Sequence, residues 1–394
     1  MKASLKLLIR LLLLPVYCIG YLVPRKKNRW VFGEANGFNN NSKYLFLETI
    51  EEHNDIQAFW IGDKKTAAEL NEKGLPAYFR YSFGGIWYAL TSKIFIVSST
   101  PGDVNFYASA GAKVINLWHG VGVKACLWAN PLHSCVKQKG WLVNFVHFLS
   151  YPHLYIKPTA VLATSVEMMR EFFIPTFEVR EDRYIVNVYP RCKFMMQSKY
   201  HILEHIRKYE TANHLYLLEK IKKFNKVIIY APTFRDAGGD FVKASGIDFE
   251  DLNDELSSIN ALFIVKFHPA TEYDPSQFDK YSNILNLDKS FDLYLIMPFS
   301  DVLVTDYSSI AYDYILLDKP VEIFAFDKYE YLEKSRKMLI PFDSAINGFS
   351  ISNTYKELKE HILGKCVLLK ACNVERWWTA NYDLYNEIKI ISIR

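Results

Sequence analysis

The stretch LVTDYSSIAYDYILLDKPVEIFAFD, residues 303–327, decides the fold, because it contains a strand, a polar turn, a helix and a second strand in succession. Val302 to Val304 form a short apolar run that is typical of a buried parallel strand. Small or polar residues follow at 305–309, apart from Tyr307, and apolar residues then recur at helical spacing over 310–317. This order of elements predicts an α/β fold with a parallel sheet.

The polar turn inside this stretch predicts a ligand site. Ser308 and Ser309 fall where the helix begins, and the first N–H groups of a helix, its dipole and two hydroxyls together favour a bound phosphate. Asp306 stands at the carboxyl end of the strand, where open α/β sheets place their ligands. Helix capping is the plainer alternative for all three residues.

Three further segments make the pattern specific. They are NLWHGVGVK at 116–124, IYAPTFRD at 229–236 and VKFHP at 265–269. In this order and at this separation, they and the first stretch resemble the CDP-glycerol glycerophosphotransferase family, which builds polyol-phosphate polymers such as teichoic acids and some capsules. Weaker matches, WVFGEANGF at 30–38 and YPR at 189–191, extend the resemblance over roughly residues 30 to 390.

The resemblance implies an enzyme. It would transfer glycerol phosphate from CDP-glycerol to a hydroxyl of a lipid-linked polymer or saccharide acceptor and release CMP, on the cytoplasmic face of the cell membrane. Ribitol phosphate is the alternative cargo, and a glycosyltransferase that uses a nucleotide sugar is the alternative enzyme, because a fold does not fix the donor. An inactive scaffold that binds nucleotide or lipid is the alternative outside enzymes.

Alternating apolar runs and helical stretches predict two doubly wound Rossmann-like domains. The expected strands of the first are 30–32, 57–61, 94–98, 114–118 and 160–163, and those of the second are 227–231, 262–267, 284–285, 302–305 and 321–324. The resemblance implies the GT-B arrangement, in which two such domains face a cleft. The predicted boundaries are a membrane-associating segment at 1–28, an acceptor-side domain at 29–205, a CDP-polyol domain at 206–375 and a helix at 376–394 that packs back on the first domain; the aromatic stretch 377–391 is read as that helix.

The apolar segment from Leu5 to Val23 predicts membrane association. Its uncharged part, from Leu11, is shorter than the roughly 20 residues of a spanning helix, so an interfacial or re-entrant anchor is favoured over a true span and over a core helix. Arg25, Lys26 and Lys27 follow it, as expected beside anionic lipid.

An aromatic insertion at 134–158 has two interpretations. Trp141, Phe145 and Phe148 fall on one helical face, with Lys137, Lys139 and Lys157 in the same insertion. Core packing is the ordinary reading of such a stripe, and a second membrane contact is the sharper one.

Composition excludes some classes. Half of the 394 residues are hydrophobic, and the net charge of +4 comes without a long basic tract, so a disordered chain and a nucleic-acid partner are both disfavoured. The six cysteines, at 18, 126, 135, 192, 366 and 372, have no metal-type spacing and fit reduced thiols. No cofactor and no protein-bound metal are expected, although a magnesium ion carried by the nucleotide is compatible with the sequence.

Two histidines are the candidate catalytic residues. His119 ends a predicted strand before Gly120 and Gly122, and the resemblance makes it the base for the acceptor hydroxyl, with Gly120 and Lys124 at the substrate. This loop reads HGVGVK where many relatives have HGTPLK. His268 ends a strand of the second domain and by resemblance contacts the diphosphate. A structural histidine is the alternative at both positions.

The remaining candidates would contact the phosphates and the polyol. Arg235 suits phosphate oxygens, and an ion pair with Asp236 or another carboxylate is its equal alternative. Ser308 and Ser309 are the phosphate site argued above. Asp306 and Asp313 would repel a diphosphate, so they are expected to contact hydroxyls or to orient a histidine. Thr305 completes the substrate-binding set.

Overall fold

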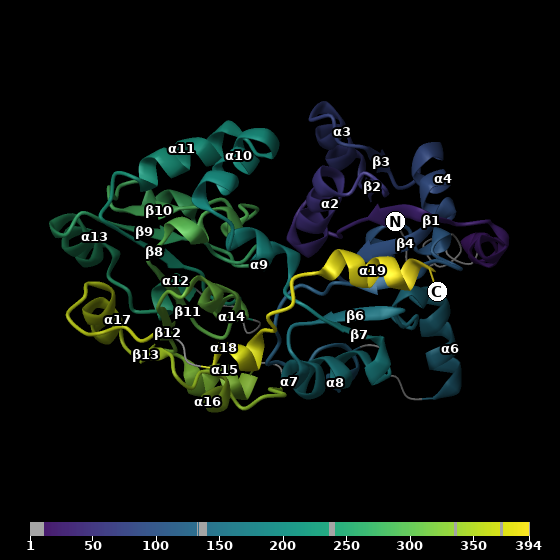
Figure 1. Cartoon of the computed structure of the whole chain (residues 1–394). Coiled ribbons are helices and arrows are strands. Elements are labelled where there is room, and N and C mark those ends of the chain that lie inside the picture. The colour runs from purple at the N-terminus through teal and green to yellow at the C-terminus, as the bar shows by residue number, and fades with distance from the viewer. Residues whose placement is uncertain are drawn as a thin grey trace. The chain divides into compact units, whose positions relative to one another are not determined.

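The computed structural model describes residues 12–131, 133, 140–235, 241–334, 337–370 and 373–393. The chain divides into two compact units, each built around one parallel sheet (Figure 1). Unit 1 consists of Met1–His119, Cys126–Lys193 and Trp378–Arg394, and unit 2 consists of Gly120–Ala125 and Phe194–Trp377. The predicted pair of α/β sheets is therefore present.

Unit 1 holds a seven-stranded sheet in the order β3-β2-β1-β4-β5-β6-β7. The strands are β1 (Lys26–Phe32), β2 (Gln57–Gly62), β3 (Ala77–Phe79), β4 (Ser92–Val97), β5 (Lys113–Asn116), β6 (Ala160–Ala163) and β7 (Tyr184–Val186). The helices are α2 (Asn40–Glu52), α3 (Lys64–Glu72), α4 (Phe83–Thr91), α6 (Trp141–Ser150), α7 (Val166–Met168), α8 (Ile174–Phe177), α9 (Pro190–Met195) and α19 (Leu384–Ile393).

Both faces of this sheet are covered, which explains its continuous apolar strands. Successive side chains of a strand point to opposite faces. Trp30 of β1 packs against Tyr385 of α19, with ring centroids 5.5 Å apart. The next residue, Val31, belongs to a cluster on the opposite face that includes Ala89 of α4.

Unit 2 holds a six-stranded sheet in the order β10-β9-β8-β11-β12-β13. The strands are β8 (Lys226–Tyr230), β9 (Ala261–Val265), β10 (Ile284–Asn286), β11 (Val302–Thr305), β12 (Val321–Phe324) and β13 (Ser350–Ser352). The helices are α10 (Lys199–Tyr209), α11 (Ala212–Ile221), α12 (Phe241–Ala244), α13 (Phe249–Ser258), α14 (Ile310–Tyr314), α15 (Lys328–Lys334), α16 (Phe342–Ala345), α17 (Tyr355–Ile362) and α18 (Val374–Trp377). One core cluster joins β8, β9 and β11 to α13 and α17.

The expected strands are all present, with ends that differ by up to four residues. β6, β11 and β12 begin and end where the apolar runs predict, and β1 begins four residues before the predicted Trp30. The sequence analysis missed β3, β7 and β13, because a strand of three residues at or near a sheet edge has too few positions to show a pattern.

The predicted helix at 377–391 is wrong as one element. The stretch forms the end of α18 and most of α19, and residues 378–383 between them are not helical. Backbone groups of this break bond to unit 1: the Thr379 N–H donates to Thr164 at 2.7 Å, and the carbonyl of Asn381 accepts from Val188 at 3.0 Å. These bonds hold an extended chain that joins the sheet edge.

The lipid role predicted for Arg25 is corrected by its contacts. Its guanidinium donates to the carbonyl oxygens of Ala89, Ser92, Ala108 and Ala110 at 2.5–3.2 Å, so it ties β1 to the chain around β4. Burial lowers the pKa of Arg25 to about 10, and the group stays charged at pH 7. Arg25 is therefore a structural residue of unit 1.

The apolar segment before Arg25 is described from residue 12, and residues 5–11 lie outside the described part. Residues 12–19 are helical, and the ring of Tyr17 stacks on Phe106 at a centroid distance of 4.9 Å. Leu12 and Leu22 remain exposed at 68% and 82%. Within the described residues, no helix combines the length and the apolar character needed to cross a bilayer.

We predict that Arg25→Ala lowers the free energy of unfolding by about 2–3 kcal/mol, because four backbone carbonyls that point at one cation lose their donor. Urea unfolding followed by circular dichroism measures the change. Lys27→Ala, at an exposed position of β1, is the control and should leave the midpoint unchanged. Equal stability of Arg25→Ala and wild type would contradict the structural role.

Candidate functional site

Arg235 lies just beyond the carboxyl end of β8 and forms a buried ion pair with two carboxylates. Its Nε donates to Asp327 at 2.6 Å, and its Nη2 lies 2.8 Å from Oδ2 of Asp306. Burial alone would lower the pKa of Arg235, but Asp306 and Asp327 outweigh burial and raise it above the ordinary value. Arg235 therefore forms an ion pair, which was one of its two predicted roles. The partners seen are Asp306 and Asp327, whereas Asp236 lies outside the described residues.

Asp306 and Thr305 hold the loops around Arg235 together. Asp306 is 3% exposed and accepts the backbone N–H groups of Thr233 and Tyr307 at 2.8 and 2.6 Å. The hydroxyl of Thr305 is buried and donates to the carbonyl of Ala231 at 2.7 Å. Both residues fix the loop after β8 against the loop after β11, and their predicted contacts with substrate stay predictions.

Aromatic rings complete the cluster and bring Lys124 to it. Tyr307 stacks on Tyr331 with centroids 3.7 Å apart, and Arg235 lies 5.1 and 4.9 Å from the two rings. The ammonium of Lys124 lies 4.9 Å from the centroid of Tyr331. The backbone of Lys124 pairs with Met338, which makes this short segment part of unit 2.

The predicted phosphate site is partly exposed and lies close in sequence to Asp306. Ser308 and Ser309 are half-buried, and the Oγ of Ser308 accepts the N–H of Ile310 at 3.4 Å. Ser309 makes no side-chain bond to the start of α14. Asp313 differs: it is fully buried, and Tyr294 donates to its carboxylate. Its predicted polyol contact stays a prediction, and the structure gives Asp313 an internal partner.

His268 follows β9 and is exposed. Its Nδ1 accepts the backbone N–H of Ala270 at 3.1 Å. A nitrogen that accepts a hydrogen bond carries no proton, so the proton of the neutral ring stands on Nε2. His268 therefore presents a donor from the carboxyl edge of the unit 2 sheet.

His119 follows β5 in unit 1 and has the opposite tautomer. Its Nδ1 lies 3.2 Å from the carbonyl oxygen of Ser98. A carbonyl oxygen can only accept, so Nδ1 carries the proton and Nε2 has the lone pair. Desolvation and, less strongly, Arg191 lower the pKa of His119 to about 4. This pKa keeps the ring neutral at pH 7, and the side chain is open to solvent.

The backbone before His119 is held in an unusual conformation. Trp118 has a φ of +54°, a left-handed conformation that costs a bulky residue about 1–3 kcal/mol. Asn116 accepts the N–H of Trp118 at 2.8 Å, and Asn41 donates to its carbonyl at 2.9 Å. Arg191 donates to the carbonyl of His119 at 2.9 Å. Three polar side chains thus hold this turn.

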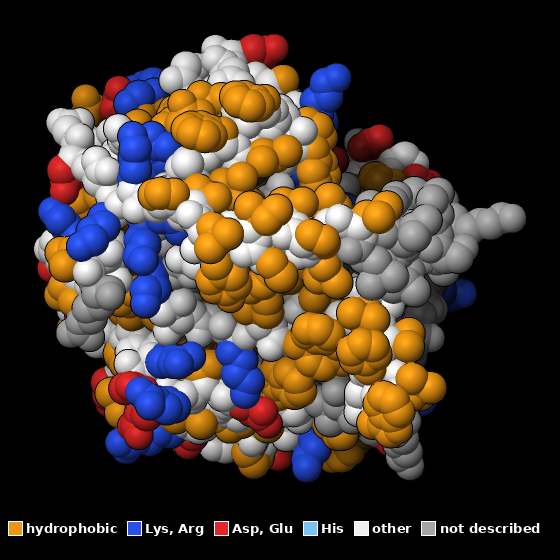
Figure 2. Space-filling view, turned by 90° about the vertical axis from the view of Figure 1, so that its right-hand side faces the viewer, with side chains coloured by type: hydrophobic (Ala, Val, Ile, Leu, Met, Phe, Trp, Pro, Cys, Tyr) orange, Lys and Arg blue, Asp and Glu red, His pale blue; other side chains and the backbone are white. Residues whose placement is uncertain are grey.

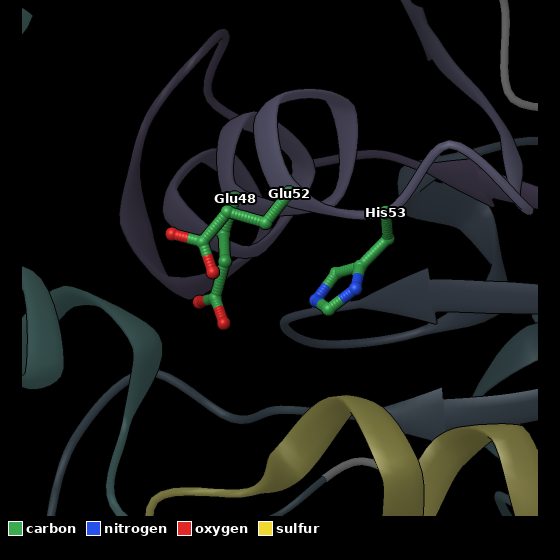
Figure 3. Close-up of side chains that lie close together, drawn as sticks. All are labelled: Glu48, Glu52 and His53. Carbon is green, nitrogen blue, oxygen red and sulfur yellow. The ribbon is translucent and has the colours of Figure 1, made fainter.

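Among the described residues, one group of acidic and histidine side chains has the spacing of metal ligands. Glu48, Glu52 and His53 have ligand atoms within 4.8 Å of one another, and Figure 3 shows both carboxylates and the imidazole edge on one side of α2. Lys193 already donates to Glu48 at 2.7 Å, and the ring of His53 stacks flat on Tyr385 at 3.4 Å. These partners give the group a structural role, and we assign no metal to it.

Sequence reasoning missed several residues that build these two arrangements. They are Asn41, Asn116 and Arg191 around the turn of His119, and Tyr307, Asp327 and Tyr331 around Arg235. Asn116 ends β5 and Asp327 follows β12, which was an available signal, as was the weak YPR match for Arg191. Nothing in the sequence marks Asn41 or Tyr331, because each acts on a residue far along the chain.

The family model for CDP-Glycerol:Poly(glycerophosphate) glycerophosphotransferase matches residues 16–365. A teichoic acid poly(glycerol phosphate) polymerase of Bacillus spizizenii is 25% identical over 384 residues, which are 91% of this chain and 90% of the relative. A teichoic acid poly(ribitol-phosphate) polymerase of the same species is 27% identical over 327 residues, which are 81% of this chain; the chain spans about half (48%) of that longer relative.

Solved structures show the same fold at low identity. The wall teichoic acid polymerase TagF matches with a TM-score of 0.65 and 18% identity, over 99% of this chain and 91% of that one. A UDP-GlcNAc 2-epimerase from Neisseria meningitidis, bound to UDP-GlcNAc, matches with a TM-score of 0.54 and 12% identity, over 92% and 99%. Proteins of different activity share this fold, so the fold alone does not decide the function.

We predict that Arg235→Ala lowers the free energy of unfolding by about 3–5 kcal/mol, because it leaves Asp306 and Asp327 buried without their cation. Urea unfolding at pH 7.5 measures this loss. Lys334→Ala, which removes an exposed pair with Glu330, is the matched control and should not move the midpoint. A variant as stable as wild type would mean that Arg235 is not a structural cation.

Proposed function

The chain belongs to the CDP-glycerol:poly(glycerophosphate) glycerophosphotransferase family, and we propose that His119 is the base of its transfer reaction and that His268 binds the leaving phosphate. It is a glycerophosphotransferase of teichoic acid synthesis that uses CDP-glycerol. The proposed acceptor is a hydroxyl at the end of a lipid-linked polymer or saccharide.

The observation that carries this proposal is the opposite tautomers of the two histidines. A base needs a lone pair, and the bond from His119 to the Ser98 carbonyl leaves the lone pair on Nε2. A group that binds phosphate oxygens needs a proton, and the bond from Ala270 to His268 leaves the proton on Nε2. Backbone groups set both tautomers, and backbone groups do not titrate.

The proposed step is a displacement at phosphorus. The acceptor hydroxyl oxygen forms a bond to the phosphorus of the glycerol phosphate, and its proton passes to Nε2 of His119. The bond from that phosphorus to the oxygen of the CMP phosphate breaks, and CMP leaves with its charge bound by the N–H of His268. The Nε2 lone pair of the neutral His119 ring is available for the first transfer near pH 7.

The other candidate residues are proposed either to contact the donor or to hold the loops around it. Lys124, Ser308 and Ser309 are proposed to contact the phosphates of CDP-glycerol, and Gly120 to let the donor approach the backbone. Arg235 is proposed to keep the loops of unit 2 in place through its two carboxylates, so its effect on the donor would be indirect.

Ribitol phosphate is the second candidate cargo. The observation that favours it is the poly(ribitol-phosphate) polymerase among the relatives, at an identity similar to that of the glycerol enzyme. Incubation of the purified protein with CDP-glycerol, CDP-ribitol or a nucleotide sugar, with membrane extract as acceptor and with CMP release as the readout, separates these donors.

We also propose that unit 1 binds the membrane surface through exposed apolar side chains. The core-packing interpretation of α6 does not hold: the helix contains no buried residue, and Trp141 and Phe145 are 80% and 52% exposed. On α4, Phe83 and Trp87 are 87% and 53% exposed. Figure 2 shows a broad hydrophobic area on this side of the molecule with Lys and Arg side chains along its border. Apolar area bordered by cations suits an anionic bilayer.

We predict that His119→Ala lowers kcat by about two to four powers of ten and leaves the affinity for CDP-glycerol nearly unchanged, because a base acts on the proton of the acceptor. CMP release gives kcat, and isothermal titration gives the affinity. His201→Ala, on the exposed side of α10, is the control. If the affinity collapses while turnover of bound donor persists, His119 is a binding residue instead.

The membrane proposal predicts a loss of vesicle binding. Replacing Trp141, Phe145 and Phe148 together by Ser should lower the partition onto vesicles with anionic lipid by about tenfold or more, since the exposed apolar area of α6 is lost. Sedimentation with the vesicles measures it, and turnover of a soluble acceptor should persist. Tyr329→Ser in unit 2, at a residue 88% exposed, is the control. Unchanged partition of the triple variant would move the contact away from α6.

A further inference from the structure

Two buried carboxyl groups lie at the edge of the unit 1 sheet that carries His119. Glu34 follows β1 and is 5% exposed, and Asp103 ends a short 3-10 turn after β4 and is 2% exposed. Gly33 lets the two segments meet, because a Cβ at this position would stand 2.6 Å from the carbonyl oxygen of Asp103.

Asp103 fixes the turn that orients His119. Its Oδ2 accepts the backbone N–H groups of Ser98, Ser99 and Thr100 at 3.0, 2.8 and 3.4 Å. The carbonyl of Ser98 is the group that holds Nδ1 of His119. The carboxylate therefore acts on the residue that selects the histidine tautomer.

Glu34 interacts with both residues that hold His119. It hydrogen-bonds the side chain of Ser98 and is attracted by Arg191, which donates to the carbonyl of His119. Its Oε1 accepts the N–H of Ala35 at 3.0 Å, while its Oε2 is buried without a hydrogen-bond partner among the described residues. A buried oxygen without a partner costs stability, so packing does not account for a glutamate here.

The two acids influence each other's charge. Burial and the nearby Glu34 raise the pKa of Asp103 to about 7, and burial raises the pKa of Glu34 although Ser98 and Arg191 oppose it. A carboxyl whose folded pKa is raised binds its proton better in the folded state, so its contribution to stability declines as pH rises from about 4 to 7. The capping of the turn at Thr100 accounts for the presence of a buried carboxylate at Asp103. It does not account for the buried Glu34.

We propose that Glu34 and Asp103 are a positioning pair for His119: the ionised Asp103 holds Ser98, and through it the imidazole, in the orientation that accepts the acceptor proton, and Glu34 sets the charge beside Asp103. This inference rests on the proposed role of His119 as base. The charged group that acts on Glu34 is Arg191 of α9; the titratable ring of His119 is neutral at pH 7, and Lys43 of α2 lies over the rings of Phe38 and Tyr44.

The pair should produce an acidic limb in the pH profile of kcat. As pH falls through about 7, Asp103 is protonated and its hold on three N–H groups weakens, whereas His119 remains neutral until far lower pH. Glu34→Gln keeps the shape but removes the neighbouring charge, so the pKa of Asp103 falls. The limb should move to lower pH by about 1 unit or more, and the plateau kcat should fall about tenfold or more because Arg191 loses a partner.

The experiment measures kcat and KM for CDP-glycerol between pH 5 and pH 9 in wild type, Glu34→Gln, Asp103→Asn and Glu322→Gln, each corrected for the folded fraction. Asp103→Asn should lose the limb. Glu322 of β12 is the matched control: it is also a buried glutamate with a raised pKa and an oxygen without a hydrogen bond, and it belongs to unit 2. Its substitution should leave the limb in place.

The outcomes separate the inference from the proposed function. The positioning role of the pair is refuted if the acidic limb lies at the same pH in wild type and Glu34→Gln. It is also refuted if the plateau kcat is equal in the two proteins. A shift of the limb by Glu322→Gln as large as that by Glu34→Gln also overturns it, because any buried carboxyl would then do the same. Wild-type protein without CMP release on any donor overturns the proposed function and needs no variant.

Discussion

The carboxyl edge of a doubly covered parallel sheet is the constraint on which the rest of this structure depends. The central strands of both sheets are buried, so the loops that follow the strands are where a polar side chain can meet a ligand. His119 and His268 stand at such edges, one in each unit. A backbone carbonyl holds Nδ1 of the first, and a backbone N–H holds Nδ1 of the second.

The two edges use charge in different ways. In unit 2, Arg235 is surrounded by two carboxylates and two stacked rings, those of Asp306, Asp327, Tyr307 and Tyr331. Its charge is therefore neutralised by groups of the protein itself. Such a cluster fixes loops, and breaking it would leave two buried carboxylates. In unit 1 the cation is Arg191, and its contacts are to a carbonyl and an amide as well as to an acid, which leaves a carboxyl pair that is only partly neutralised.

The sequence predicts the parts of the fold that repeat a local pattern. Apolar runs of four to six residues locate β6, β8, β9, β11 and β12, since each is buried on both faces. The three-residue strands β3, β7 and β13 have no clear local signal, and the break at 378–383 is held by tertiary bonds such as that from Thr379 to Thr164. The two histidines are predictable by resemblance, whereas their tautomers depend on Ser98 and Ala270. Arg235 had two equal readings, because the choice between phosphate and carboxylate rests on Asp327, which is distant in sequence.

The source of any pH dependence near neutrality follows from these assignments. A histidine base with an ordinary pKa would itself become protonated as the pH falls below about 6.5, and its protonation would stop the reaction. Here desolvation and Arg191 lower the pKa of His119, so its own protonation lies far below the neutral range. The bond to the Ser98 carbonyl cannot titrate either. Among the groups linked to His119 through Ser98, Asp103 is the one whose pKa is raised toward 7, because burial and Glu34 both act in that direction. The pH response proposed for His119 would therefore depend on the acid that holds Ser98 in place.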